Sequence, residues 1–130
     1  MADVNRGNRP LSPHLQVYRL PLAAVTSIMT RITGHALVAG IVLIVWWLVA
    51  AVSSAGAFAC ADWVMRSWLG FIILTGAMWA LWYHLLAGLR HLFYDAGYGL
   101  EIETSQKSSQ AVIAGSVVLA LVTLIIFFLF

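Results

Sequence analysis

Two histidines and a glycine recur on one side of the stretch "WYHLLAGLRHLFYD", residues 82–95, at the end of an apolar run. On a helix of 3.6 residues per turn, His91 lies about 20° around the axis from His84, and Gly88 lies about 40° from it. The two imidazoles therefore share a helix face with a residue that has no side chain. Inside a membrane a neutral imidazole can bind haem iron axially, and the glycine would leave room for a flat ligand or a second helix.

Other roles of the buried histidine remain open on spacing alone. His84 lies roughly 9 Å of helix rise from Arg90, and ionisable residues at such depth usually face a partner, a cavity or a cofactor. A contact in which His84 hydrogen-bonds to another helix explains the pattern as well as haem does, and a proton relay or ion pathway is a further alternative.

A haem at this position would need partners beyond His84. Its two propionates are anionic and should lie toward the membrane surface, where Arg31, Arg90 and His91 are available as cations or donors. His91 shares the face of His84, so one flat haem cannot take both. A second axial histidine is therefore expected from another chain.

The remaining candidate ligands are few. His14 is expected at the surface, and His35 lies near the membrane boundary, where contact with headgroups or a neighbour explains it. Cys60 is the single cysteine, so it can form neither an intrachain disulfide nor a cysteine-based metal site or redox pair.

The elements that must carry these residues are membrane-spanning helices. Of the 130 residues, 62% are hydrophobic and only 9% charged, whereas soluble domains carry about a quarter charged residues. Three charge-free runs are long enough for a helix of roughly 20 apolar residues, which predicts an all-α protein with spans at about 33–53, 67–89 and 109–130. Their continuous apolarity argues against the alternating segments of a β-barrel.

The positive charges predict the orientation. Arginines precede the first span and Arg90 and Lys107 flank the second loop, so the N-terminus and that loop are expected in the cytoplasm. The net charge of +2 is explained by this bias and does not suggest a nucleic-acid partner. We expect one membrane-anchor domain over residues 1–130, exposed to membrane lipid and needing a membrane partner to enclose a large site.

The segments outside the spans are short. A surface-lying amphipathic piece, "LSPHLQVYRLP", is expected between the polar tail and the helical pattern that begins at Leu22. Pro13 and Pro21 at its two ends argue against one long helix through it. The small residues of "SSAGAFACADW" form the outer connection, where Trp63 and Trp68 suit the membrane interface.

Two motifs together resemble a known family. "RPLSPHLQVYRLP", running on to "SIMTRITG", resembles the N-terminal signature of the succinate dehydrogenase cytochrome b family, and "HLLAGLRHLFYD" resembles its second signature. The resemblance covers about residues 9–130, including motif order, spacing and three-span topology. It implies a membrane anchor in the bacterial inner membrane, with the mitochondrial inner membrane less favoured.

The resemblance also implies a complex and its cofactors. A flavoprotein subunit and an iron–sulfur subunit would oxidise succinate and pass electrons to ubiquinone, since this chain has no dinucleotide motif or cysteine cluster. A second three-span anchor would share haem b with this chain. The alternatives are the anchor of a quinol:fumarate reductase working in reverse, and a structural anchor without a redox cofactor.

Individual residues match the signatures of the family. His84 matches the axial haem ligand, Ser27 and Arg31 match quinone-site positions, and His91 and Arg31 fall where the haem propionates are approached. A hydroxyl and a permanently charged guanidinium would stabilise the negative charge on a quinone that accepts electrons. Thr30 departs from the pattern, because many members have histidine there, so proton delivery or propionate contact can differ.

Overall fold

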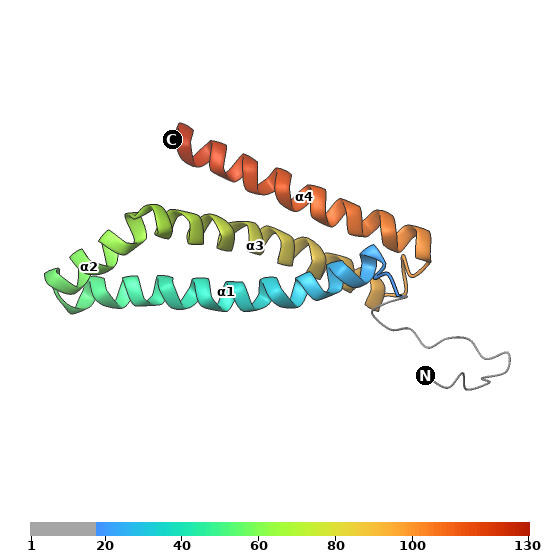
Figure 1. Ribbon diagram of the computed structural model, residues 1–130, viewed down its shortest axis with the longest axis horizontal. Coiled ribbons are helices and arrows are strands. Elements are labelled where there is room, and N and C mark those ends of the chain that lie inside the picture. Colours follow the sequence, from blue (N-terminus) through green and yellow to red (C-terminus); the bar gives the residue numbers. More distant parts are fainter. Residues whose placement is uncertain (1–17) are drawn as a thin grey trace, which may run out of the picture.

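Four helices make up the computed structural model, which describes residues 18–130. They are α1 (Leu22–Ser53), α2 (Ala55–Arg66), α3 (Trp68–Asp95) and α4 (Ile102–Leu129). The described residues contain no strand, and α1, α3 and α4 are each long and apolar enough to cross a membrane. The predicted all-α class and three spans are confirmed (Figure 1). Most of the predicted surface segment, with His14, lies outside the described residues.

The helices extend beyond the predicted spans because polar residues continue the helical hydrogen bonding past the apolar run. The fourth helix begins at Ile102, seven residues before the predicted span. Its first turns carry an ion pair between Glu103 and Lys107 at 2.7 Å, four residues apart on one face. Third-helix residues beyond 89 likewise stay helical to Asp95. Hydropathy therefore predicted the apolar part of each helix rather than its ends.

The connection between α1 and α3 is itself helical, which the small-residue composition did not predict. Ser54 caps α2 by accepting a hydrogen bond from the Ala57 amide, and Ser67 caps α3 by accepting one from Gly70. The corner between the two helices needs glycine at position 70, since the carbonyls of Val64 and Met65 occupy the space of a side chain. The chain thus turns between spans without leaving helical structure for more than one residue.

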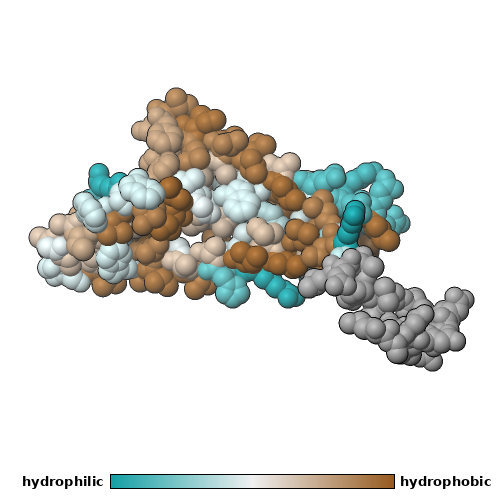
Figure 2. Space-filling view, viewed as in Figure 1, coloured by the Kyte–Doolittle hydropathy of each residue, from teal (hydrophilic) through white to brown (hydrophobic). Residues whose placement is uncertain are grey.

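The helices pack through small and hydroxyl-bearing side chains, while their large apolar side chains face outward. The buried residues of α1, α3 and α4 are mainly of this small or polar kind: Thr26, Thr33, Gly40, Ala50, Gly70, Ala80, Ala87, Ser109, Ser116 and Ala120. Such residues let membrane helices approach closely. Apolar side chains cover much of the visible surface and polar ones gather mainly near the α3–α4 loop (Figure 2).

The three long helices meet most closely at the end that carries the α3–α4 loop. Figure 1 shows α1 and α3 side by side, while α4 diverges from them toward the C-terminus. A small core of Tyr83, Ala87 and Val112 lies at the junction. Toward the diverging end, the Trp82 indole N–H donates to Thr123 Oγ1 at 3.0 Å and holds α4 against α3. The residues that the sequence predicts to bind haem and quinone lie around this junction.

Candidate functional site

The imidazole of His84 on α3 is held by the backbone of α1. Its Nδ1 lies 3.1 Å from the Thr30 carbonyl oxygen and 3.4 Å from Thr33 Oγ1. A carbonyl oxygen only accepts, so Nδ1 carries the proton and donates it, and Nε2 keeps its lone pair. Fixing the tautomer through the second nitrogen is how proteins orient a metal-binding histidine.

Glycines on both helices leave space around this imidazole. A Cβ added at Gly34 on α1 would lie 3.2 Å from His84 Cε1, so the missing side chain lets the ring lie close to the helix. A Cβ at Gly88, one turn along α3, would meet no described residue within 4 Å. The space beside His84 on its own helix face is therefore open on the surface of the bundle.

The predicted quinone residues lie on the segment of α1 that meets His84. Ser27 and Arg31 are about 40° apart around the helix, and Gly34 lies about 20° from Ser27 on the same face. Ser27 is half-buried and Arg31 is exposed. The Thr30 hydroxyl donates to the Thr26 carbonyl at 2.9 Å, so it is bonded within its own helix. Ser27, Arg31 and His84 thus come to one side of the bundle.

His91 and His35 each interact with a residue of their own helix. The ring of His91 is half-buried and stands edge-on to Tyr94, with ring centroids 6.0 Å apart. His35 is exposed, and its Nδ1 lies 2.8 Å from the Arg31 carbonyl of its own helix. His35 therefore makes no contact with the His84 ring through this nitrogen.

Arg90 does not lie where it was predicted. It was expected beside Arg31 and His91, facing the membrane surface, but its side chain is buried inside the bundle with 6% of its surface exposed. Nη1 donates to Thr26 Oγ1 at 2.9 Å and to Ser109 Oγ at 2.8 Å. Six residues rotate a helix by about 120° net, so Arg90 points between α1 and α4 and away from the His84 face.

Comparison with known proteins now bears on this site. Residues 5–123 match the family described as succinate dehydrogenase/fumarate reductase transmembrane subunit. The chain belongs to this family. It is 89% identical over 130 residues, the whole of both chains, to the succinate dehydrogenase cytochrome b556 subunit of Paracoccus denitrificans.

Two more distant relatives carry related names. The cytochrome b556 subunit of Rickettsia conorii is 36% identical over 111 residues, which are 85% of this chain and 86% of the relative. The mitochondrial cytochrome b560 subunit of Bos taurus is 38% identical over 111 residues, which are 82% of this chain and 64% of the relative. The resemblance of the two motifs to this family is thus confirmed.

The residues present in this family member fit a haem better than a bare metal ion. Within residues 18–130 no group of three or more histidine, cysteine, aspartate or glutamate side chains could hold a metal ion. A single free imidazole nitrogen is the donor set that suits a macrocycle, because porphyrin supplies its own nitrogens and the protein adds axial ligands. His84 has this character.

An apolar groove extends from this site toward the α2 end of the bundle. It lies between α1 and α3, has a volume of about 330 Å³, and is lined by Leu37, Gly40, Ile41, Ile44, Leu74, Ala77, Met78 and Leu81. Leu81 is three residues before His84, so the groove begins about one turn from the imidazole. Polar side chains lie at one end of the site and hydrocarbon at the other, as an amphipathic ligand standing in a membrane requires.

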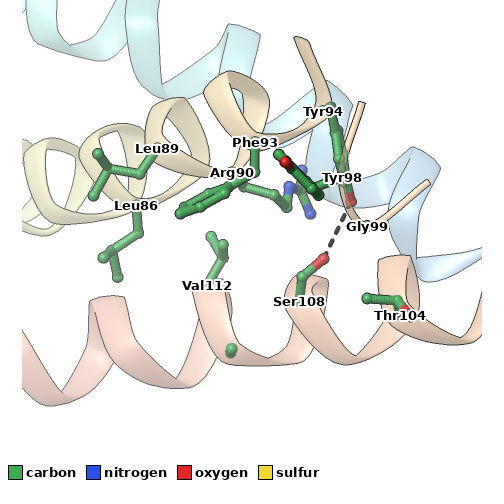
Figure 3. A pocket seen from close by; sticks show the side chains of 11 residues that line it. Leu86, Leu89, Arg90, Phe93, Tyr94, Tyr98, Gly99, Thr104, Ser108 and Val112 are labelled. Carbon is green, nitrogen blue, oxygen red and sulfur yellow. Dashed lines mark hydrogen bonds between the residues drawn. The ribbon is translucent and has the colours of Figure 1, made fainter. Parts of the chain in front are cut away.

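A second cavity, of about 460 Å³, lies on the opposite side of α3 (Figure 3). Arg90 lines it, but none of Ser27, Arg31, His84 and His91 does. Leu86 and Val112 line its apolar part, and Tyr94 and Ser108 line its polar end, where their hydroxyl oxygens are 3.1 Å apart.

The Arg90 guanidinium and the hydroxyls of Thr26 and Ser109, which meet between α1, α3 and α4, were not predicted as a group. Their signal was the presence of threonine and serine near the ends of apolar runs.

Proposed function

We propose that this chain is a membrane-anchor subunit of succinate:ubiquinone oxidoreductase that supplies one haem b ligand and part of the ubiquinone site. The observation that carries the proposal is the hydrogen bond from His84 Nδ1 to the Thr30 carbonyl, which leaves Nε2 with a lone pair beside the open space at Gly88. Family membership and the cytochrome b names of the relatives support it.

His84 would be the axial ligand of haem b, which when bound supplies a one-electron carrier within the membrane. The Thr30 carbonyl orients the ring and makes it a better donor. Arg31 and His91 would contact the propionates as cation and N–H donor. Arg90 has no part in this contact, because its guanidinium is bonded to hydroxyls inside the bundle.

Ser27 and Arg31 would bind ubiquinone at the cytoplasmic end of α1. The serine hydroxyl donates to a quinone oxygen, and the arginine places a permanent positive charge beside it. Both groups interact more strongly with the reduced quinone, whose oxygens carry more negative charge, and this differential favours electron acceptance. Thr30 has a hydroxyl bonded to its own helix, so it would not deliver a proton in place of the histidine common in the family.

The remaining components would come from other chains. His91 cannot bind the far side of a haem held by His84, so the second axial ligand would belong to a second three-span anchor seated over the open face. A flavoprotein and an iron–sulfur subunit would carry out succinate oxidation. The single anchor domain, residues 1–130, would lie in the bacterial inner membrane, which agrees with the bacterial Paracoccus relative. Its N-terminus would lie in the cytoplasm.

The deciding experiment is a reduced-minus-oxidised spectrum of the complex purified through a tag on this chain. A b-type signal together with a co-purified flavoprotein is expected. His84→Ala should abolish two-histidine iron ligation, whereas His35→Ala, which alters an exposed histidine bonded to its own helix, should not. A complex without haem, or unchanged ligation in His84→Ala, would refute the haem role and favour a purely structural anchor.

A further inference from the structure

A buried hydrogen-bond network joins all three long helices next to the proposed quinone segment. Arg90 Nη1 on α3 donates to Thr26 Oγ1 on α1 and to Ser109 Oγ on α4. The Thr26 and Ser109 hydroxyl oxygens are themselves 3.3 Å apart. The Tyr83 hydroxyl donates to the Thr26 carbonyl at 3.0 Å. Thr26 is therefore held by α3 at both its side chain and its backbone.

These contacts fix α1 relative to α3 at two heights. The lower contact holds Thr26, and the upper contact is the hydrogen bond of His84 to the Thr30 carbonyl one turn later. Ser27 lies between the two contacts, and Arg31 directly follows the second. A helical segment held at both ends can neither rotate nor slide independently of His84. The network thus determines where the Ser27 hydroxyl and the Arg31 guanidinium point relative to the imidazole.

The cationic member of this network is costly to bury. Arg90 cannot lose its proton, and the ion pairs of residues 18–130, Asp62–Arg66 and Glu103–Lys107, do not include it. Its Nε is buried and has no hydrogen-bond partner among the described residues. A buried cation held by neutral hydroxyls is poor at stabilising a fold compared with apolar packing. A role in fixing geometry explains its presence better than a role in stability.

We propose that Arg90 is a positioning residue of the quinone site, which acts through Thr26 to hold Ser27 and Arg31 in place opposite His84. The proposal rests on the proposed function, because it assigns the network to the quinone segment. It separates Arg90 from the propionate-binding role that the sequence suggested. It also predicts that loss of the Thr26 hydroxyl, which touches neither quinone nor haem, affects quinone binding.

The test compares two isosteric substitutions in the assembled complex in membranes. Thr26→Val removes the hydroxyl that Arg90 contacts, and Thr123→Val removes the hydroxyl that accepts from Trp82 far from the site. The measurements are KM and kcat for a short-chain ubiquinone, with succinate oxidation by an artificial acceptor reporting the amount of assembled complex. We expect Thr26→Val to raise the quinone KM roughly five- to tenfold and also to lower kcat, because Ser27 and Arg31 favour the reduced quinone. Thr123→Val should leave both unchanged.

Substitutions of Arg90 itself supply a second measurement. Arg90→Lys keeps the charge and a donor and should return the quinone KM partway to that of the parent, whereas Arg90→Met should not. Because Arg90→Met can fail to assemble, Thr26→Val decides in that case. An unchanged quinone KM in Thr26→Val, or an equal rise in Thr123→Val, would overturn the proposal.

Parallel variants separate this inference from the proposed function. If Ser27→Ala and Arg31→Ala leave quinone reduction unaltered, the quinone site itself is misassigned. If those variants impair quinone reduction while Thr26→Val does not, only the positioning role of Arg90 fails.

Discussion

His84 packs against α1 at Gly34, where an added side chain would crowd the imidazole. A methyl group at position 34 would lie 3.2 Å from His84 Cε1, which is closer than about nine in ten natural contacts of that kind. The ring also bonds the Thr30 carbonyl one turn away. The orientation of the proposed iron ligand therefore depends on a glycine of another helix.

Gly34→Ala is expected to shift the redox potential and the low-spin spectrum of the haem while the complex still assembles, because the added methyl displaces or tilts the imidazole. Gly34→Val should have a larger effect and reduce haem content. Gly56→Ala is the matched control, since a Cβ there meets no described residue within 4 Å. Redox titration of purified complexes makes the comparison, and an unchanged potential in both Gly34 variants would contradict it.

Gly88→Leu tests whether the open face of α3 is an interface. A Cβ added there meets no described residue within 4 Å, so the helix itself should still insert, but a haem or a second anchor could no longer approach. We expect loss of haem and of co-purifying partners with this subunit still present in the membrane. Gly76→Leu is the matched control, because it changes the other glycine of α3 whose added Cβ meets no described residue. Retention of partners in Gly88→Leu would place the interface elsewhere.

Helical periodicity predicted which residues share a face but not which faces meet. His84, Gly88 and His91 could be placed on one face because they lie on one helix, and the same holds for Ser27 and Arg31. The bond between His84 and the Thr30 carbonyl could not be predicted, because it depends on the relative height and rotation of α1 and α3. The spans themselves were predictable from length and apolarity alone.

The position of Arg90 was predicted wrongly for the same reason. Its place at the end of an apolar run suggested a cation at the membrane surface, which is the usual location of such a residue. The structure buries it, because Thr26 and Ser109 on two other helices supply hydroxyl acceptors at its height. Sequence spacing within α3 carries no information about those acceptors. The helical connection between α1 and α3 was not predicted, because capping serines rather than composition define it.

The contact between Trp82 and Thr123 should contribute to stability and not to electron transfer. Thr123→Val leaves the indole N–H without its acceptor. Interhelical hydrogen bonds in membranes contribute about 0.6 kcal/mol on average, so thermal dissociation of the complex should occur only slightly earlier. Monitoring haem loss during heating measures this, with Trp82→Phe as the reciprocal change. A large loss of quinone reductase activity in either variant would mean that α4 helps to shape the site.

The strongest functional prediction concerns Arg31. Arg31→Ala should lower the rate of ubiquinone reduction on the order of ten- to hundredfold, because it removes a fixed charge that interacts most strongly with the reduced quinone. Succinate oxidation by an artificial acceptor should be unaffected, since that chemistry is on other chains. Ser27→Ala should act in the same direction but more weakly, as a neutral donor is lost in place of a charged one.

Two further arginine variants sharpen the Arg31 measurement. Arg31→Lys keeps the charge without the planar fork and should fall between the parent and Arg31→Ala. Arg19→Ala removes another exposed arginine near the same end of the chain and should leave both assays unchanged. Equal losses with ubiquinone and with the artificial acceptor in Arg31→Ala would indicate impaired assembly and count against a quinone role. A loss in Arg19→Ala as large as that in Arg31→Ala would mean that general positive charge, and not the position of Arg31, promotes the reaction.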